Sequence, residues 1–207
     1  VIYKNEDFAG IYAGAMEVMG STVTMEFCTI VGNSASGYAA GIWLEASDLR
    51  LTSTILWGNK NLGGDEDNLF IFEGEDPYSV EASHCIIGGE PEILGDTSFD
   101  ADPLFAGPGI AEFEAEWGDF HLRADSPAVN AGAFVADVGT DIDGDLRLCG
   151  DGPDIGADEI CPAPVLFRRG DGNADGTVDI SDGIACICYL FLGCYIRCYE
   201  ACNANDD

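Results

Sequence analysis

Two stretches of the chain align without a gap at an offset of 26 residues, and they decide the fold. The first reads AGAMEVMGSTVTMEFCTIVGN from Ala13 to Asn33, and the second reads AAGIWLEASDLRLTSTILWGN from Ala39 to Asn59. Apolar and polar residues alternate in Val23–Phe27, as they do in a strand that buries one face. Self-similarity at a fixed period of roughly 20 to 50 residues indicates stacked repeating units. Because the units lack a helical period, we expect each of them to consist of strands.

The two copies both end in Gly-Asn, and related fragments flank them. Ile2–Asn5 resembles the tail of an earlier copy, and Ser83–Gly89 resembles the tail of a later one. This spacing predicts a right-handed parallel β-helix with one coil per repeat and coils about 4.8 Å apart. Ile30 should then lie over Leu56, and Met25 over Leu51. Asn5, Asn33 and Asn59 should form a ladder of side-chain amides at one turn.

The composition restricts the classes of partner. The 207 residues include 38 acidic and 8 basic side chains, so the formal net charge is −30. Such a chain repels phosphate backbones and anionic lipid, which excludes nucleic-acid binding and membrane-surface binding. It attracts divalent cations and suits a secreted protein, although the charge alone also keeps a protein soluble. No run of about 18 apolar residues predicts a membrane span, and no signal peptide is visible. The chain begins without Met and within a strand pattern, so we expect a fragment at both ends.

Oxygen-bearing side chains near the C-terminus have the spacing of a calcium-binding loop. In the stretch DGNADGTVDISD, they fall at positions 1, 3, 5, 9 and 12, and Gly176 at position 6 permits the sharp turn. Position 7 would contribute its backbone carbonyl. A solvated acidic turn is the alternative. The expected calcium ligands are Asp171, Asn173, Asp175, Thr177, Asp179 and Asp182.

The residues after this loop extend the pattern. Ile184, Ile187, Cys188 and Phe191 have helical spacing, and Gly193 is a plausible helix end. Residues 203, 205 and 207 repeat the first three ligand positions 32 residues after the first loop, but this second copy breaks off before its glycine. Residues 168–207 therefore resemble a dockerin, a duplicated calcium loop–helix module, and the Asp at position 12 is typical of that family.

The dockerin resemblance implies calcium-dependent docking to a cohesin-like protein. Dockerins contact cohesins through loop positions 10 and 11 and through the following helix. Those positions are Ile180 and Ser181 here, whereas the best-known dockerins have two hydroxyl residues. The resemblance therefore implies the class of partner, and this departure puts a standard cohesin in doubt.

An ordered series of short motifs follows the repeats. It consists of DPLF at 102–105, GDFHL at 118–122, SPAVNAG at 126–132, TDIDGDLR at 140–147 and DIGADE at 154–159. Together they resemble the C-terminal end of secreted bacterial parallel β-helix proteins, except that Asn130 stands where Asp is commoner. We interpret this region as a cap that covers the open last coil. Asp141, Asp143 and Asp145 would either hold a second cation or form Asx turns.

Nine cysteines leave several alternatives open. Five of them lie between Cys186 and Cys202, and Cys149 and Cys161 flank one turn. Partial disulfide pairing in an oxidising compartment, free buried thiols and a metal site are all compatible with this pattern. The odd count leaves at least one cysteine unpaired or paired outside this chain.

Residues 60–78 predict an acidic excursion from a coil, either a solvated insertion or a binding loop. The sequence provides no catalytic motif such as G-x-S-x-G or H-E-x-x-H. Basic residues that could assist polysaccharide cleavage are limited to Arg50, Lys60 and Arg123 in the coil region. Asp119 and His121 share a strand face, which is common in inert proteins. We therefore assign no catalytic residues.

The sequence thus predicts three segments: a β-helix with its cap at 1–160, a linker at 161–167 and the dockerin-like module at 168–207. We expect a secreted, non-catalytic β-helix scaffold with a calcium-binding docking module, and we expect a polysaccharide as a second class of partner. The alternative is the C-terminal part of a carbohydrate-active enzyme, a lyase or glycoside hydrolase, whose catalytic coils lie upstream. A fold alone does not decide between them.

Overall fold

The computed structural model shows a mostly β protein with parallel strands and one C-terminal helix. The chain divides into two compact units, Val1–Cys161 and Pro162–Asp207. Each unit is described separately below. The residues described are 1–3, 5–7, 13–61, 63–89, 95–107, 119–136, 139–148, 150–161, 170–173 and 177–192.

The strands of the first unit form four parallel sheets. Each sheet takes one strand from each successive turn of the chain, and equivalent strands are neighbours. The four-stranded sheet contains β1 (Ile2–Tyr3), β5 (Thr29–Val31), β9 (Ile55–Trp57) and β13 (Ile86–Ile87). The three-stranded sheets contain β2 (Glu6–Asp7), β6 (Ser34–Ala35) and β10 (Lys60–Asn61); β3 (Met16–Met19), β7 (Ile42–Glu45) and β11 (Leu69–Phe72); and β4 (Thr22–Glu26), β8 (Asp48–Thr52) and β12 (Ser79–Ser83).

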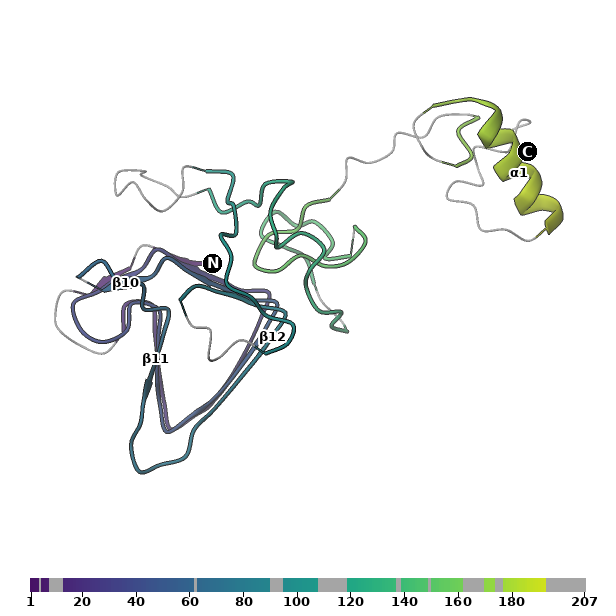
Figure 1. Cartoon of the computed structure of the whole chain (residues 1–207). Helices are drawn as coiled ribbons and strands as arrows, with labels where there is room; N and C mark the ends of the chain where they lie inside the picture. Colours follow the sequence, from purple (N-terminus) through teal and green to yellow (C-terminus); the bar gives the residue numbers. More distant parts are fainter. Residues whose placement is uncertain are drawn as a thin grey trace. The chain divides into compact units, whose positions relative to one another are not determined.

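The register follows the 26-residue repeat. Ile30 pairs with Leu56 and Met25 pairs with Leu51, so both predicted pairs are confirmed. Successive turns therefore overlie one another in Figure 1, where β10, β11 and β12 lie on different sides of a common outline. Stacked parallel sheets of this kind are compatible with the predicted β-helix.

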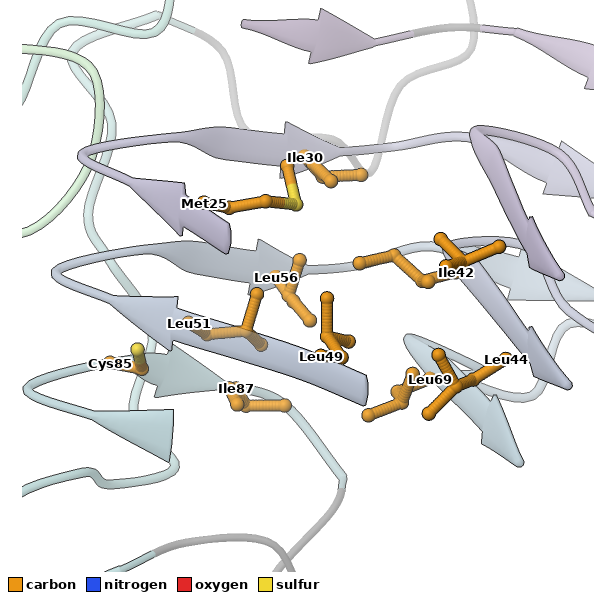
Figure 2. Close-up of a cluster of buried hydrophobic side chains, with 11 residues drawn as sticks. Met25, Ile30, Ile42, Leu44, Leu49, Leu51, Leu56, Leu69, Cys85 and Ile87 are labelled. Carbon is orange, nitrogen blue, oxygen red and sulfur yellow. The ribbon is translucent and has the colours of Figure 1, made fainter. Parts of the chain in front are cut away.

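The core lies inside this stack. Alternate residues of β8 point inward, so Leu49 and Leu51 are buried while Asp48 and Arg50 are exposed. Figure 2 shows equivalent side chains from successive turns meeting in layers, including Ile30 and Leu56. Each fully buried aliphatic side chain contributes about 1.5–3 kcal/mol relative to an exposed one. The stack therefore depends on one inward-facing row from each strand.

The corners between strands repeat a left-handed backbone conformation. Such a positive φ is strained for any residue with a Cβ and is relaxed for glycine. The first corner has Gly20 (φ 55°) in one turn and Ala46 (φ 48°) in the next, and another corner has Gly32 (63°), Gly58 (60°) and Gly89 (73°). A third corner uses only larger residues: Phe27 (51°), Ser53 (48°) and His84 (52°).

The predicted asparagine ladder is present and has one more member. The Asn5 side-chain amide donates to the Asn33 carbonyl oxygen at 3.0 Å, and the Asn33 amide donates to Asn59 at 2.8 Å. Asn59 in turn donates to Asn68 at 2.7 Å, and Asn68 donates to the backbone oxygen of Gly88. Because Asn33, Asn59 and Asn68 are buried, this chain of bonds satisfies amides that would otherwise be costly to bury.

The predicted excursion at residues 60–78 is wrong in part. Leu69–Phe72 forms β11 and pairs in register with β7, so this segment belongs to the stack. Glu73–Tyr78, between β11 and β12, is an exposed insertion relative to the preceding turn, and residues 63–66 before β11 are exposed as well. The sequence pattern missed β11 because insertions change the offset from 26 residues to 27 at β11 and to 31 at β12.

The region predicted as a cap contacts the side of the stack. The Gly156 amide donates to the Ser53 carbonyl at 2.8 Å, and the Ala157 amide donates to Thr29 Oγ1 at 2.9 Å. A Cβ at Gly156 would lie 2.6 Å from Ile55, so only glycine permits this approach. These contacts are on β5, on β9 and on the corner before β9, and Ile86 of β13 packs in the same apolar cluster as Leu122 and Ile155. The edge of β13 is also extended by a parallel bridge between Ile86 and Phe99.

The second unit contains α1 (Ile180–Leu192), which confirms the helix predicted after the acidic loop. Cys186 and Cys188 on α1 and Cys161 in the first unit are disulfide-bonded, whereas Cys28 and Cys85 are free thiols. In the part of the chain that the structure describes, no helix has the length and apolar character needed to cross a bilayer.

Candidate functional site

The acidic loop is joined to α1 by a reciprocal pair of side-chain caps. Asp179 Oδ1 accepts the backbone N–H of Ser181 at 2.7 Å, and Asp182 Oδ2 accepts the backbone N–H of Asp179 at 2.7 Å. This is the capping-box arrangement, which satisfies amides that the first turn of a helix leaves unpaired. The local sequence therefore starts the helix directly after loop position 9.

Asp182 also closes the loop. Its other oxygen, Oδ1, accepts the backbone N–H of Asn173 at 3.3 Å, and the Asn173 side-chain amide donates to Ser181 Oγ at 2.9 Å. Loop positions 3, 9 and 12 are thus drawn together around one carboxylate. A helix cap alone does not require the contact with Asn173.

The predicted calcium ligands differ in exposure. Asp171 and Asp182, at positions 1 and 12, are only 2% and 3% exposed. Asn173 is half-buried, and Thr177 and Asp179 are exposed. Asp175 lies outside the described residues. The structure therefore joins the Asp182 carboxylate to the backbone amides of Asn173 and Asp179, and it buries Asp171 at the start of the loop.

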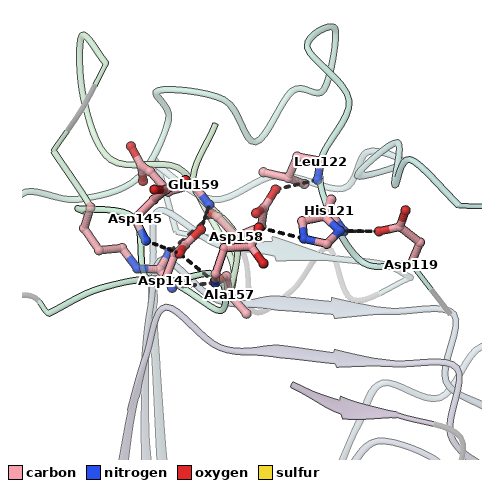
Figure 3. A network of polar contacts seen from close by, with 10 residues as sticks. Asp119, His121, Leu122, Asp141, Asp145, Ala157, Asp158 and Glu159 are labelled. Atoms are coloured by element: carbon pink, nitrogen blue, oxygen red, sulfur yellow. Dashed lines mark hydrogen bonds and ion pairs between the residues drawn. The ribbon is translucent and has the colours of Figure 1, made fainter. Parts of the chain in front are cut away.

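A second polar cluster lies in the first unit and is centred on His121. Its Nδ1 is paired with Asp119 Oδ1, which also accepts the His121 backbone N–H at 3.1 Å. Its Nε2 lies 2.9 Å from Asp143 Oδ2. Figure 3 shows the imidazole between Asp119 on one side and further carboxylates on the other. The Asp119 hydrogen bond raises the pKa of His121, burial opposes this shift and Asp143 adds to it.

Asp158 completes this cluster from a buried position. It is 4% exposed, and its Oδ2 accepts the backbone N–H of Leu122 at 2.7 Å. Burial raises the pKa of Asp158. One ligand atom from each of His121, Asp143 and Asp158 lies within 4.8 Å of the other two.

The structure supports the Asx-turn interpretation of the acidic motif at 141–145. Asp141 Oδ1 accepts the backbone N–H groups of Asp143 and Asp145, both at 2.8 Å, and its Oδ2 accepts that of Glu159 at 3.0 Å. Burial of Asp141 acts against ionisation, but these backbone donors outweigh it and lower the pKa of Asp141. The Asp141 oxygens are thus engaged by the backbone, and Asp143 faces His121 instead.

Buried charges hold the end of the first unit together. Arg147 is 5% exposed, donates to the carbonyl oxygens of Gly156, Ala157 and Asp158, and lies 4.8 Å above the Phe27 ring. Glu159 accepts the Asp154 N–H at 2.8 Å, and burial raises the pKa of Glu159 to about 7. These groups bind backbone or a ring, which indicates a structural role.

The basic residues of the coil region are exposed in the described structure. Arg50 pairs with Glu81 at 2.9 Å and Arg123 pairs with Asp125 at 3.0 Å, and all four side chains are exposed. Lys60 is exposed on β10. Exposed pairs of this kind contribute little to stability, about 0–1 kcal/mol.

Comparisons with protein-family models, with curated protein sequences and with solved structures found no match to this chain.

Sequence reasoning missed the cluster around His121. It noted Asp119–His121, the acidic motif at 141–145 and the DIGADE motif as separate features. The distances in sequence from His121 to Asp143 and Asp158 follow no helical or strand period, so no pattern predicted their contact. The sequence did show that all three motifs contain Asp, Glu or His, which can bind metals, and that they lie close together in the chain.

Proposed function

We propose that this protein is an extracellular, non-catalytic scaffold in which a right-handed parallel β-helix bears a calcium-binding docking module. The observation that carries this proposal is the closed acidic loop before α1. The stacked parallel sheets support the scaffold part. Every strand equivalent from turn to turn is paired in parallel, as a solenoid requires.

The donor set of the loop fits calcium. Carboxylate, amide and carbonyl oxygens are the ligands that this hard cation prefers, and it takes about six to eight of them. Asp171 and Asp182, at loop positions 1 and 12, are both buried. A cation bound between the two ends of the loop would interact favourably with both carboxylates.

The residues that would hold calcium are those predicted from the loop spacing: Asp171, Asn173, Asp175, Thr177, Asp179 and Asp182. Bound calcium would neutralise the mutual repulsion of the carboxylates. Asp182 would keep the loop joined to α1 through its bonds to the Asn173 and Asp179 amides. The free energy of calcium binding would in this way stabilise the helix that follows.

Helix α1 provides the docking surface of this proposal. Ile180 and Phe191 are 83% and 79% exposed, and Ile184, Ile187 and Leu190 are exposed as well. Apolar side chains in such numbers on one helix favour a protein partner that covers them. We propose a cohesin-like protein as that partner, because Ile180 occupies loop position 10.

Calorimetric titration of the full chain with Ca²⁺ tests the proposal. We expect saturable binding to the wild type, at least about tenfold weaker binding to Asp171→Asn, and poor substitution by Mg²⁺, which requires a stricter octahedral site. Asp76→Asn removes a charge from the exposed insertion and should bind Ca²⁺ like the wild type. Absence of calcium-dependent heat, or equal affinities in both variants, would show an acidic turn only.

The docking part has its own readout in the same samples. Immobilised cohesin-like domains should retain the calcium-loaded chain and release it when a chelator is added. Ile184→Asp should abolish retention without changing the affinity for Ca²⁺, because the Ile184 side chain is exposed and outside the ligand set. Retention that is unaffected by the chelator would contradict a calcium-dependent interface.

A further inference from the structure

We propose that His121, Asp143 and Asp158 form a binding site for a zinc-like divalent transition metal in the first unit. The site is separate from the calcium loop and does not rest on it. Its three side chains come from three segments, and their ligand atoms lie within 4.8 Å of one another.

The Asp119 contact gives the imidazole the orientation of a metal ligand. Asp119 pairs with Nδ1, and the other ring nitrogen, Nε2, lies 2.9 Å from Asp143 Oδ2. Ligating histidines almost always donate their other ring N–H to a carboxylate or carbonyl group, which fixes the tautomer. Asp119 would therefore be a positioning residue for the site.

The carboxylates are also held in place. Asp158 is buried and fixed by the Leu122 amide, while the Asp143 segment is anchored through Asp141 to the Glu159 amide. Ile142 donates from the same segment to the Ala157 carbonyl at 3.1 Å. These hydrogen bonds hold the three segments together without a metal ion.

The distances suit a small cation after modest side-chain rotation. Zinc bonds to nitrogen and carboxylate oxygen are about 2.0–2.2 Å, so tetrahedral ligand atoms lie roughly 3.4 Å apart. His121 Nε2 and Asp143 Oδ2 are 2.9 Å apart, and the largest separation in the group is within 4.8 Å. Three protein ligands leave one tetrahedral position for water or an external ligand.

The ligand chemistry separates this site from the calcium loop. Imidazole nitrogen suits Zn²⁺ and similar transition metals, whereas Ca²⁺ and Mg²⁺ take oxygen ligands. A cation here would also lie among Asp119, Asp143 and Asp158, whose combined negative charge favours it. The competing interpretation is an ion-pair cluster in which His121 is protonated and bridges Asp119 and Asp143.

Cobalt spectroscopy of the full chain tests the site, with Co²⁺ as the probe and saturating Ca²⁺ present to occupy the acidic loop. We expect a visible absorption band typical of nitrogen and oxygen ligands, without a thiolate charge-transfer band, and displacement of Co²⁺ by Zn²⁺. Asp143→Asn should weaken Co²⁺ binding at least about tenfold, and Asp119→Asn should weaken it by roughly 10- to 100-fold. Both side chains are about half-exposed, so these variants should fold.

Asp145→Asn is the matched control, because it removes an exposed carboxylate from the same segment but not from the ligand set. It should bind Co²⁺ like the wild type. The proposal is overturned if the wild type binds no Co²⁺, if Asp143→Asn and Asp145→Asn bind equally, or if a thiolate band shows that cysteines are the ligands. The first of these results would leave the ion-pair interpretation.

Discussion

At the scale of single residues, the burial of Glu159 makes the stability of the fold depend on pH. Its side chain is 3% exposed, and burial raises its pKa to about 7, well above its ordinary value of 4.5. The folded state therefore binds a proton more readily than the unfolded state does. The resulting stabilisation is fully present below the unfolded pKa and is lost as the pH rises through about 7.

We predict that the free energy of unfolding falls between pH 5 and pH 8 in metal-free buffer, and that Glu159→Gln removes about 2–3 kcal/mol of this fall. Glutamine is neutral throughout and can still accept the Asp154 N–H. Burial also raises the pKa values of Asp154 and Asp158, so they contribute in the same direction. Denaturant unfolding at the two pH values gives the comparison.

Asp145→Asn provides the control for this measurement, because it removes an exposed carboxylate from the same region of the first unit. A Glu159→Gln protein with the same fall in stability as the wild type would assign the response to other groups. A free energy of unfolding that increases with pH would contradict the predicted fall.

The spacing of residues along the sequence predicted a contact only where the two residues are separated by the period of the repeat. Asn33 and Asn59 lie 26 residues apart, and their bond was predictable from the repeat. Asn68 joins the same ladder only nine residues after Asn59, because a shorter path brings it back to the stack. His121 and Asp158 meet through irregular loops, and no spacing rule covers such a contact.

At the scale of the elements, the corners between strands determine how each turn closes. Gly20 and Ala46 occupy the same corner of consecutive turns, and both have a positive φ. Alanine is strained in this conformation, by about 1–2 kcal/mol in left-handed geometry, whereas glycine is not.

We predict that Ala46→Gly stabilises the protein by roughly 0.5–1 kcal/mol, because it relieves this strain at a cost in chain entropy. The preceding turn already has glycine there. Thermal unfolding should show a higher midpoint temperature than the wild type.

Ala82→Gly is the matched comparison, since Ala82 lies within β12 and pairs with Leu51. Glycine in a strand interior should destabilise by roughly 0.5–1 kcal/mol. If the two substitutions change stability in the same direction, the corner conformation does not explain the effect of Ala46→Gly.

Elements with alternating polarity were predictable, and elements displaced by insertions were not. β4 and β8 follow from alternation, and α1 follows from the helical spacing of its apolar residues. β11 was hidden because the acidic residues before it suggested an excursion, although the strand pairs in register with β7. The contact of Gly156 with Ser53 is tertiary packing, which no local pattern specifies.

At the scale of the whole molecule, the two units have different sources of stability. The first contains the layered aliphatic core and the asparagine ladder. In the second, Asp182 is the buried residue that α1 contributes, and many apolar side chains of α1 are exposed. We therefore expect the second unit to depend on ligands to a degree that the first does not.

We predict two transitions in calorimetric unfolding of the full chain. The midpoint temperature of the second unit should rise with free Ca²⁺. At a free Ca²⁺ concentration one hundred times the dissociation constant, its free energy of unfolding should increase by about 2.7 kcal/mol. The transition of the first unit should respond to pH through Glu159 but not to Ca²⁺. A single transition, or equal shifts of both with Ca²⁺, would contradict this independence.

The insertion Glu73–Tyr78 has a consequence for how such a chain can change over evolutionary time. It leaves the stack after β11 and returns at β12, while the strands on both sides keep their pairing partners. Additional residues at that corner therefore do not shift any layer of the core, whereas a residue added within β8 would move its inward row to the outside. At this corner the length of the chain can vary, whereas within β8 it cannot. Residues can therefore be inserted or replaced in such a loop over evolutionary time, while the pairing of the strands on either side is retained.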